Sequence, residues 1–586
     1  MLKYLITIFV IILFATVFVS EQDIPNGIIE SKNYAFVLVA ISLVIILLSV
    51  FLWNDNANLQ IHYLDICLLL FLAWVLFNTL ILKQLSPSII IATFTDSVIL
   101  SLIFKQFLKI NKDYFLLFSE AFLFVGGIEA VLGLLQLYGF QQSLHNGFKM
   151  TGSFHNPGPF GIYIASVCCV ALGNYLFSNN YFLKNMAGIV GLLCFLVLPS
   201  TQSRSAWIAI LLGGGYLLFT KYGLKYIKQY FANQYINVLF YLALIGLGFG
   251  AYYFKANSAL GRVLTWRVGL DMVKQNPMTG IGYGEFPYQY GFYQADFFRN
   301  NPNNPTFIAL ADKNDYAFND YLQILIENGF VGFILLLLII GFVLFSKPST
   351  TQASDYVYPY RAGIIAILGA GCFSYPFELI PLWWLLLFFI SMVSAEIESL
   401  YSFSMFSKSL KLSFMVMVCI FAVLFSKNII HRYQTMQKVK QADEALAMQN
   451  YDEATKRYEE ILTETPDKRL ILVGYGKALH MNRNVKESAV ILEKASHTMA
   501  DPFLFSNLGD AYQATNQFDL AERAYQQSSN MIPNRMYPKY LLAKMYWKQH
   551  DTLRAKQTAK QIMEMPIKVP SQAITQMKRE MNEVLQ

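Results

Sequence analysis

Long apolar runs recur along the first 427 residues and are separated by short polar connections. Because a helix needs about 20 predominantly apolar residues to cross a bilayer, this pattern predicts thirteen membrane spans. The first run carries only Lys3 ahead of its apolar part and no small-residue cleavage site before Glu21, which favours an uncleaved anchor over a signal peptide. The spans are expected near residues 2–20, 34–54, 62–82, 88–108, 114–138, 159–178, 184–199, 206–220, 235–254, 323–346, 361–379, 381–398 and 411–427.

The pattern changes after about residue 427, where the chain becomes rich in Lys, Glu, Gln and Ala and has no long apolar run. The whole chain is 55% hydrophobic and 14% charged, whereas ordinary soluble domains carry about 25% charged residues. We therefore expect an all-α protein of two domains, a polytopic membrane helical bundle over residues 1–427 and a soluble domain over residues 428–586.

The expected soluble domain repeats itself with a period of 33 or 34 residues. This spacing and the aligned residues resemble tetratricopeptide repeats, so the domain is expected to be an α-solenoid of helix pairs. Two roles are open: a scaffold that stabilises or oligomerises the protein, and a docking surface for a partner protein. The aligned positions are Ala454, Tyr458 and Pro466 with Ala521, Tyr525 and Pro533, and Gly476 with Gly509 and Ala543.

Lys and Arg in the short connections predict the orientation, because cytoplasmic loops carry an excess of both. Alternate connections place twelve of these residues on one side and four on the other. The first side is therefore expected to face the cytoplasm, and residues 139–158, 200–205, 255–322 and the repeat domain are expected outside it. The twelve are Lys3, Lys105, Lys109, Lys112, Lys184, Lys221, Lys225, Lys228, Lys347, Arg361, Lys408 and Lys411; the four are Lys32, Lys83, Lys149 and Arg204.

Residues 255–322 form the longest polar stretch between apolar runs. Gly, Pro and Asn punctuate it, which predicts an irregular loop. A loop of this length is usually functional or disordered, and its many aromatic residues favour function. Aromatic side chains suit stacking on sugar rings and also the belts at membrane interfaces, and the belt is the usual role. The loop residues to be tested for contact with a glycan are Tyr283, Phe286, Tyr288, Tyr290 and Tyr293.

Three arginines on the expected outer side are candidates for anion binding: Arg204 in Ser203-Arg204-Ser205, and Arg262 and Arg267 in the long loop. The planar guanidinium donates paired hydrogen bonds to phosphate oxygens and stays charged. Arg204 with Arg262 or Arg267 could thus hold a diphosphate, and of the last two Arg262 is preferred. The alternatives are that Arg204 snorkels to lipid headgroups and that the others are solvated or cap carbonyl groups.

Several stretches in a fixed order resemble the O-antigen ligase superfamily, which includes O-antigen ligases, O-antigen polymerases and protein O-oligosaccharyltransferases. The resemblance covers roughly residues 115–400 and implies a metal-independent inverting glycosyltransferase of GT-C-like helical fold in the bacterial inner membrane. It also implies a polyprenyl-diphosphate-linked glycan donor and diphosphate binding by Arg204 and Arg262. The stretches are residues 151–157, 203–207, 261–266, 276–284, 319–323 and 327–329.

One position departs from that superfamily. Its members usually have a His directly before the Asn of the Asn-x-Tyr/Phe-Leu-Gln stretch, where it is taken as the general base, and this chain has Phe318. The candidates for removing a proton from the acceptor hydroxyl are therefore His155, Asp320 and Asp315. His155 could equally be an ordinary hydrogen-bonded loop residue, and Asp320 could cap the helix that follows it.

No metal or cofactor is expected. The six cysteines all lie in apolar runs and the seven histidines have no metal-ligand spacing. The glycines of 280–284 follow no predicted strand, which argues against a nucleotide-binding loop.

The function predicted from these features is transfer of a glycan from a polyprenyl-diphosphate carrier to a hydroxyl of lipid A core or of protein Ser or Thr on the periplasmic side. The alternatives are an O-antigen polymerase and a non-catalytic transport or assembly factor of the same fold. The expected partners are the donor, the acceptor, the bilayer and a protein bound to the repeats.

Overall fold

The structure is a computed structural model of the chain, and it describes residues 2–54, 58–110, 112–231, 256–404, 408–465, 468–568 and 570–586. The chain divides into two compact units. The first comprises the described residues of 1–254 and 318–434, and the second those of 255–317 and 435–586. The described part of the long polar stretch up to Ala317 thus belongs to the same unit as the C-terminal repeats, and residues 318–322 belong to the first unit.

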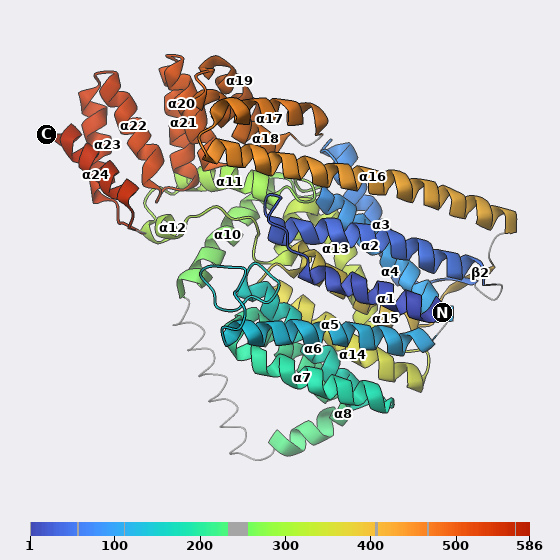
Figure 1. Cartoon of the computed structure of the whole chain (residues 1–586). Helices are drawn as coiled ribbons and strands as arrows, with labels where there is room; N and C mark the ends of the chain where they lie inside the picture. Colours follow the sequence, from blue (N-terminus) through green and yellow to red (C-terminus); the bar gives the residue numbers. More distant parts are fainter. Residues whose placement is uncertain are drawn as a thin grey trace. The chain divides into compact units, whose positions relative to one another are not determined.

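The first unit is a bundle of helices that lie side by side (Figure 1). Helices occupy twelve of the thirteen predicted span positions, and the thirteenth, 235–254, lies outside the described residues. The helices are α1 (Leu2–Ala15), α2 (Gly27–Leu52), α3 (Tyr63–Leu76), α4 (Ile89–Ile110), α5 (Asp113–Leu137), α6 (Pro157–Phe177), α7 (Tyr181–Thr201), α8 (Arg204–Phe231), α13 (Asp320–Phe345), α14 (Thr351–Gly371), α15 (Ile380–Ala395) and α16 (Lys408–Ala447).

Eight of the described helices are long and apolar enough to cross a membrane, and the chain is an integral membrane protein. Three short helical segments lie next to these helices. They are η1 (Thr16–Phe18) after α1, η2 (Phe77–Leu82) after α3, and η3 (Pro376–Glu378) between α14 and α15. The span predicted at 361–379 is shifted, because α14 begins at Thr351 and ends at Gly371. Residues 372–379, apolar enough to read as part of a span, instead connect α14 to α15.

The core of this unit lies around α6 and α15. Nearly every residue of α15 is buried, as expected for a helix with no polar face. Helix α6 packs against α7, α8 and α14, and small residues allow the close approach. A Cβ added at Gly173 of α6 would lie 2.5 Å from the Cα of Pro359 in α14.

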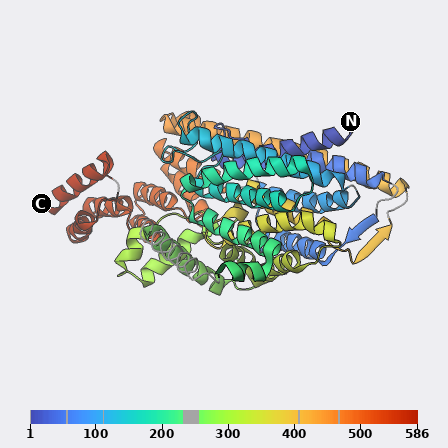
Figure 2. The same ribbon diagram turned by 90° about the horizontal axis from the view of Figure 1, so that it is seen from below.

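One end of the bundle carries the two short strands of the described residues. Strand β1 (Asn58–Ile61) pairs antiparallel with β2 (Tyr401–Ser404), with Asn58 opposite Ser404. This β-ribbon, the pair of β1 and β2, lies at the same end of the bundle as the N-terminus (Figure 2). The charge pattern predicts that this end faces the cytoplasm.

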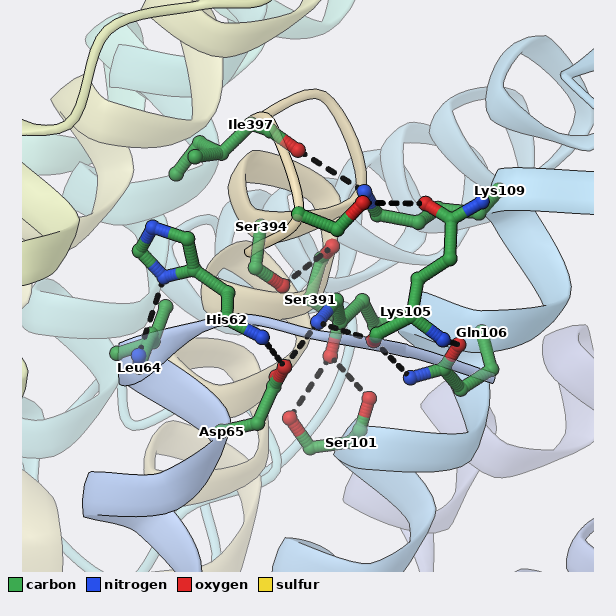
Figure 3. Close-up of polar contacts among 12 residues, drawn as sticks. His62, Leu64, Asp65, Ser101, Lys105, Gln106, Lys109, Ser391, Ser394 and Ile397 are labelled. Atoms are coloured by element: carbon green, nitrogen blue, oxygen red, sulfur yellow. Dashed lines mark hydrogen bonds and ion pairs between the residues drawn. The ribbon is translucent and has the colours of Figure 1, made fainter. Parts of the chain in front are cut away.

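A buried polar network joins this ribbon to the helices (Figure 3). Lys105 of α4 forms an ion pair with Asp65 of α3 and donates a hydrogen bond to the Gln60 carbonyl at 3.1 Å. Asp65 also accepts from the His62 backbone N–H at 2.7 Å. A buried charge is tolerated only when it is paired in this way, so the network fixes the register between the ribbon and both helices.

The second unit begins with three helices where the sequence predicts an irregular loop. They are α10 (Ala256–Gln275), α11 (Phe286–Asn300) and α12 (Pro305–Leu310). The prediction of irregular structure is wrong here because Pro287 and Pro305 lie in the first turns of α11 and α12. Proline is favoured at the start of a helix, where its missing N–H is not needed.

The rest of the second unit is a series of helix pairs with the predicted period. Tyr458 and Tyr525, 67 residues apart, are both fully buried, and each donates a hydrogen bond to the Asp fifteen residues earlier, Asp443 and Asp510. The expected all-α class with an α-solenoid is confirmed. After the end of α16 the helices are α17 (Tyr451–Glu464), α18 (Arg469–Met481), α19 (Val485–Ser496), α20 (Pro502–Ala514), α21 (Phe518–Met531), α22 (Met536–Lys548), α23 (Thr552–Glu564) and α24 (Gln572–Leu585).

Candidate functional site

Four connections of the first unit meet at the end of the bundle that the charge pattern places outside the cytoplasm. His155, just before α6, contacts Tyr375, which follows α14. Phe318, before α13, also packs on Tyr375. A Cβ added at Gly161, in the first turns of α6, would lie 2.9 Å from the Cβ of Ser203, which precedes α8. The structure therefore brings together His155, Asp320 and the start of α8, which are distant in sequence.

Residues 151–153 are held by two polar side chains of α5. Gln136 Oε1 accepts hydrogen bonds from the backbone N–H groups of Thr151 and Gly152, at 2.9 and 2.8 Å. Glu129 Oε1 accepts from the Ser153 backbone N–H at 2.8 Å and from its hydroxyl at 3.0 Å. Glu129 is completely buried, so these bonds fix the backbone that leads into His155.

Gly152 is required by this arrangement. Its φ is +56°, and an added Cβ would lie 2.3 Å from Glu129 Oε1 and 2.4 Å from the Phe160 ring. Gly139 also has a positive φ, of +81°, but a Cβ there would meet nothing within 4 Å.

We expect Gly152→Ala to destabilise the protein more than Gly139→Ala. Both changes place a side chain in the left-handed region, which costs about 1–2 kcal/mol, and only the first also overpacks a filled site, which costs about 1–3 kcal/mol more. Thermal unfolding in detergent should show a clearly lower Tm for Gly152→Ala. Equal Tm values for the two variants would contradict the packing at Glu129.

His155 is half-buried and lies against an aromatic pair. Its Nε2 is 3.3 Å from the Tyr375 hydroxyl, and the Phe318 ring packs edge-on against Tyr375 with centroids 5.5 Å apart. Burial, with the positive charge of Lys32 as a smaller cause, lowers the pKa of His155 to about 4. The imidazole is therefore neutral at physiological pH, with one nitrogen able to accept a proton.

Phe318 has a backbone φ of +53°. This region is disfavoured for bulky residues, whereas His adopts it more readily. The Phe found where a His was expected thus occupies a strained position beside Tyr375.

Asp320 is almost fully buried, at 1% exposure. Its Oδ2 accepts a hydrogen bond from the Phe377 backbone N–H at 3.1 Å, while the neighbouring Asn319 caps α13 by accepting from Leu322 N–H at 3.0 Å. The contacts of Asp320 therefore brace the connection that carries Tyr375.

Arg204 is the first residue of α8 and is half-buried. The hydroxyl of Ser203 accepts a hydrogen bond from Ala206 N–H at 3.3 Å, which caps the helix. Helices α6 and α13 also begin at this end, capped by Asn156 and Asn319. Helix N-termini favour anions through their dipoles and backbone N–H groups, so this end of the bundle has the polarity that a phosphate group requires.

Arg262 and Arg267 lie on α10 of the second unit. Arg262 is half-buried, and Trp266, one turn later, donates a hydrogen bond from Nε1 to the Ala317 carbonyl at 3.0 Å. The Arg267 guanidinium is exposed and stacks over the Phe307 ring at 5.1 Å. Of the five loop aromatics expected to contact a glycan, Phe286 and Tyr290 are instead buried in this unit.

Sequence reasoning missed Tyr375, Glu129 and Gln136. A carboxylate inside a membrane span is costly, so Glu129 could have been singled out from the apolar run at 114–138. Tyr375 has no such signal, because it lies in an aromatic stretch that reads as part of a span. Within the described residues no group of three His, Cys, Asp or Glu side chains could hold a metal ion.

A solved chain described as the APC/C hetero-tetramer Cut9-Hcn1 aligns with 94% of this chain and 90% of its own length, at 11% identity and a TM-score of 0.23. This similarity is too low to carry a conclusion about fold or function.

Two comparisons with known proteins agree with each other. Residues 189–337 match the family described as O-Antigen ligase. The "ComP-specific O-oligosaccharyltransferase" of Acinetobacter baylyi (strain ATCC 33305 / BD413 / ADP1) is 25% identical over 274 residues, which cover 44% of this chain and 47% of the relative. The match thus spans about half the length of that relative. The chain is an integral membrane protein that is similar to the O-antigen ligase family over residues 189–337.

Proposed function

We propose that this protein transfers a glycan from a polyprenyl-diphosphate carrier to an acceptor hydroxyl at the outer face of the bacterial inner membrane. The observation that carries the proposal is that the segment similar to O-antigen ligases contains Arg204, at the end of the bundle where His155 and Tyr375 meet.

Arg204 and Arg262 are the groups proposed to bind the diphosphate. Arg204 lies at a helix start, where the dipole adds to its own positive charge. Two guanidinium groups would neutralise the charge that develops on the diphosphate as it leaves. Arg267 stacks on Phe307, and its proposed contribution is smaller.

In the proposed reaction the acceptor oxygen attacks the anomeric carbon and the bond from that carbon to the diphosphate oxygen breaks. The bonding electron pair leaves with the polyprenyl diphosphate, the configuration inverts, and the hydroxyl proton passes to His155. In the proposed tautomer Nε2–H donates to the Tyr375 hydroxyl, which would orient the ring and leave Nδ1 to accept the proton. Asp320, enclosed by the connection after α14, is proposed as a positioning residue and not as the base.

Two acceptor classes fit this chemistry, a lipid A core sugar and a protein Ser or Thr. The similarity to the Acinetobacter O-oligosaccharyltransferase favours protein, because the superfamily that the sequence resembles includes protein O-oligosaccharyltransferases. The orientation that goes with this proposal places the repeats, and a protein partner bound to them, in the periplasm.

The direct test is transfer by the purified protein in detergent from a polyprenyl-diphosphate-linked oligosaccharide. We expect release of polyprenyl diphosphate that depends on the acceptor. Envelope proteins and lipid A from a strain lacking the gene would identify the acceptor, since the glycan should be lost from one of the two. The absence of acceptor-dependent release with both acceptor classes would overturn the proposal.

The pH dependence of transfer follows from the environment of His155. Its lowered pKa, about 4, keeps the basic form populated well below the usual histidine range of about 6.5. The acid limb of kcat/KM should therefore fall near pH 4–5, and His155 should cause no loss between pH 5.5 and 8. The transfer rate and the amount of folded protein would both be measured at each pH. A limb near pH 6.5 would argue that the base is a solvated histidine.

A further inference from the structure

The helices of the long polar stretch and the C-terminal repeats are joined by charges that follow the repeat period. Arg469, Asp501 and Arg535 lie 32 and 34 residues apart, each at the connection that leads into the first helix of a repeat, α18, α20 or α22. Each forms an ion pair with a residue of 285–313, and the signs alternate along the array. The pairs are Arg469 with Glu285 at 2.7 Å, Asp501 with Lys313 at 2.8 Å and Arg535 with Asp312 at 3.5 Å.

The Arg469 pair is the most enclosed of the three. The side chains of Arg469 and Glu285 are 15% and 5% exposed. One guanidinium nitrogen of Arg469 donates to both Glu285 oxygens, at 2.7 and 2.9 Å. The guanidinium also stacks over the Tyr288 ring, 4.0 Å from its centroid. Such a pair is geometrically specific, and removal of either partner would leave a buried charge uncompensated.

Backbone and packing contacts continue the same surface. The Ala500 backbone N–H donates to the Tyr288 carbonyl at 2.8 Å, and Gly291 leaves no room for a Cβ, which would lie 2.7 Å from the Ala500 oxygen. Helix α11 lies against α21 (Figure 1). Gln294 of α11 donates to the Met531 carbonyl at 2.5 Å.

The last repeat connection holds the segment after α12. The side-chain amide of Asn534 donates to the carbonyl groups of Ile308, Ala309 and Ala311, at 2.9, 3.0 and 2.8 Å. These carbonyls belong to the end of α12 and the residue after it. Three successive repeats therefore hold the stretch from Glu285 to Lys313.

We propose that the repeat domain acts as an intramolecular clamp that sets the conformation of residues 285–313 and, through their packing on α10, the position of Arg262. Arg469, Asp501 and Arg535 are positioning residues in this view. The edge formed by the connections between repeats is occupied by the chain itself, so a protein partner would use other surfaces of the repeats. The consequence for transfer rests on the proposed function; the clamp itself does not.

The test compares the rate of hydrogen–deuterium exchange of residues 286–300 between the wild-type protein and its variants, each full-length and in detergent. Arg469→Glu should raise exchange there at least tenfold, because it places two carboxylates against each other. Arg469→Lys keeps the positive charge but loses the planar guanidinium that stacks on Tyr288, so it should have a smaller effect. The double variant Glu285→Arg with Arg469→Glu should recover part of the protection. Arg554→Glu is the matched control, because among the described residues Arg554 forms ion pairs within the repeats, with Asp551 and Glu522, and stacks on Tyr546.

A second pair of variants leaves every charge in place. Gly291→Val should push α11 away from Ala500 and also raise the exchange of residues 286–300. Gly261→Val in α10 is its control, because a Cβ at that position has nothing within 4 Å, and it should leave the exchange unchanged. Unchanged exchange in both Arg469→Glu and Gly291→Val would overturn the clamp.

The same variants test positioning in the transfer assay. We expect Arg469→Glu to raise the KM for the lipid-linked donor at least fivefold, with a smaller change in the KM for the acceptor, and the charge-swapped double variant to reverse part of it. Raised exchange with unaltered donor KM would overturn the link to Arg262. If the wild-type protein transfers no glycan, the proposed function fails, and the exchange measurements still decide the clamp.

Discussion

Arg204→Ala is expected to reduce glycan transfer by about 30-fold to a few thousandfold. Truncating one partner of a desolvated charge pair costs about 2–5 kcal/mol, and about 1.4 kcal/mol corresponds to a factor of ten. The partner in this case is the donor diphosphate, which Arg204 would meet at the start of α8. The loss should appear in kcat/KM for the donor, measured as polyprenyl diphosphate released by the purified variant.

Two other arginine variants sharpen this prediction. Arg204→Lys keeps the charge but not the paired donors, so it should recover part of the activity. Arg267→Ala is the matched control, because Arg267 is exposed and stacks on Phe307. We expect a loss of no more than about fivefold, which corresponds to about 1 kcal/mol for an exposed contact of this kind. If Arg204→Ala retains full transfer while Arg267→Ala abolishes it, the assignment of the diphosphate site is wrong.

His155→Ala is expected to reduce kcat by about 100- to 10,000-fold, the usual contribution of a general base. The imidazole lies within hydrogen-bond reach of Tyr375, so Tyr375→Phe should give a smaller loss by removing the group that orients the ring. His155→Gln is the control for packing, since it keeps a polar side chain of similar reach without a titrating nitrogen. Its activity should be as low as that of His155→Ala.

Phe318 offers a rescue experiment. Its ring and His155 contact the same Tyr375, and its left-handed backbone suits His better than Phe. The double variant His155→Ala with Phe318→His should therefore regain at least tenfold of the lost rate, because it supplies a base in contact with the same Tyr375. Full activity of His155→Ala alone would show that proton removal lies elsewhere.

The local features of this chain could be predicted because they depend on neighbours in sequence. An apolar run long enough to cross a bilayer forms a helix, since its backbone groups must be satisfied within the segment. The repeat period could be read for a similar reason, because equivalent positions keep the same residue: Tyr458 and Tyr525 are both buried, and each donates a hydrogen bond to the Asp fifteen residues earlier. The alternative that Asp320 caps the helix that follows it is wrong by one residue. Asn319 caps α13, and Asp320 instead accepts a hydrogen bond from the Phe377 backbone N–H, a contact between distant parts of the chain.

The sequence by itself determined the class of the protein, the order of its membrane helices and the presence of helical repeats, because hydrophobic period and length act locally. Only the tertiary structure decided that Tyr375 meets His155, that Asp320 braces a connection from α14, and that residues 285–313 pack along the repeats. These contacts join residues 57 to 226 positions apart. Their free energy depends on burial and geometry that arise only after packing, so no pattern along the chain records them.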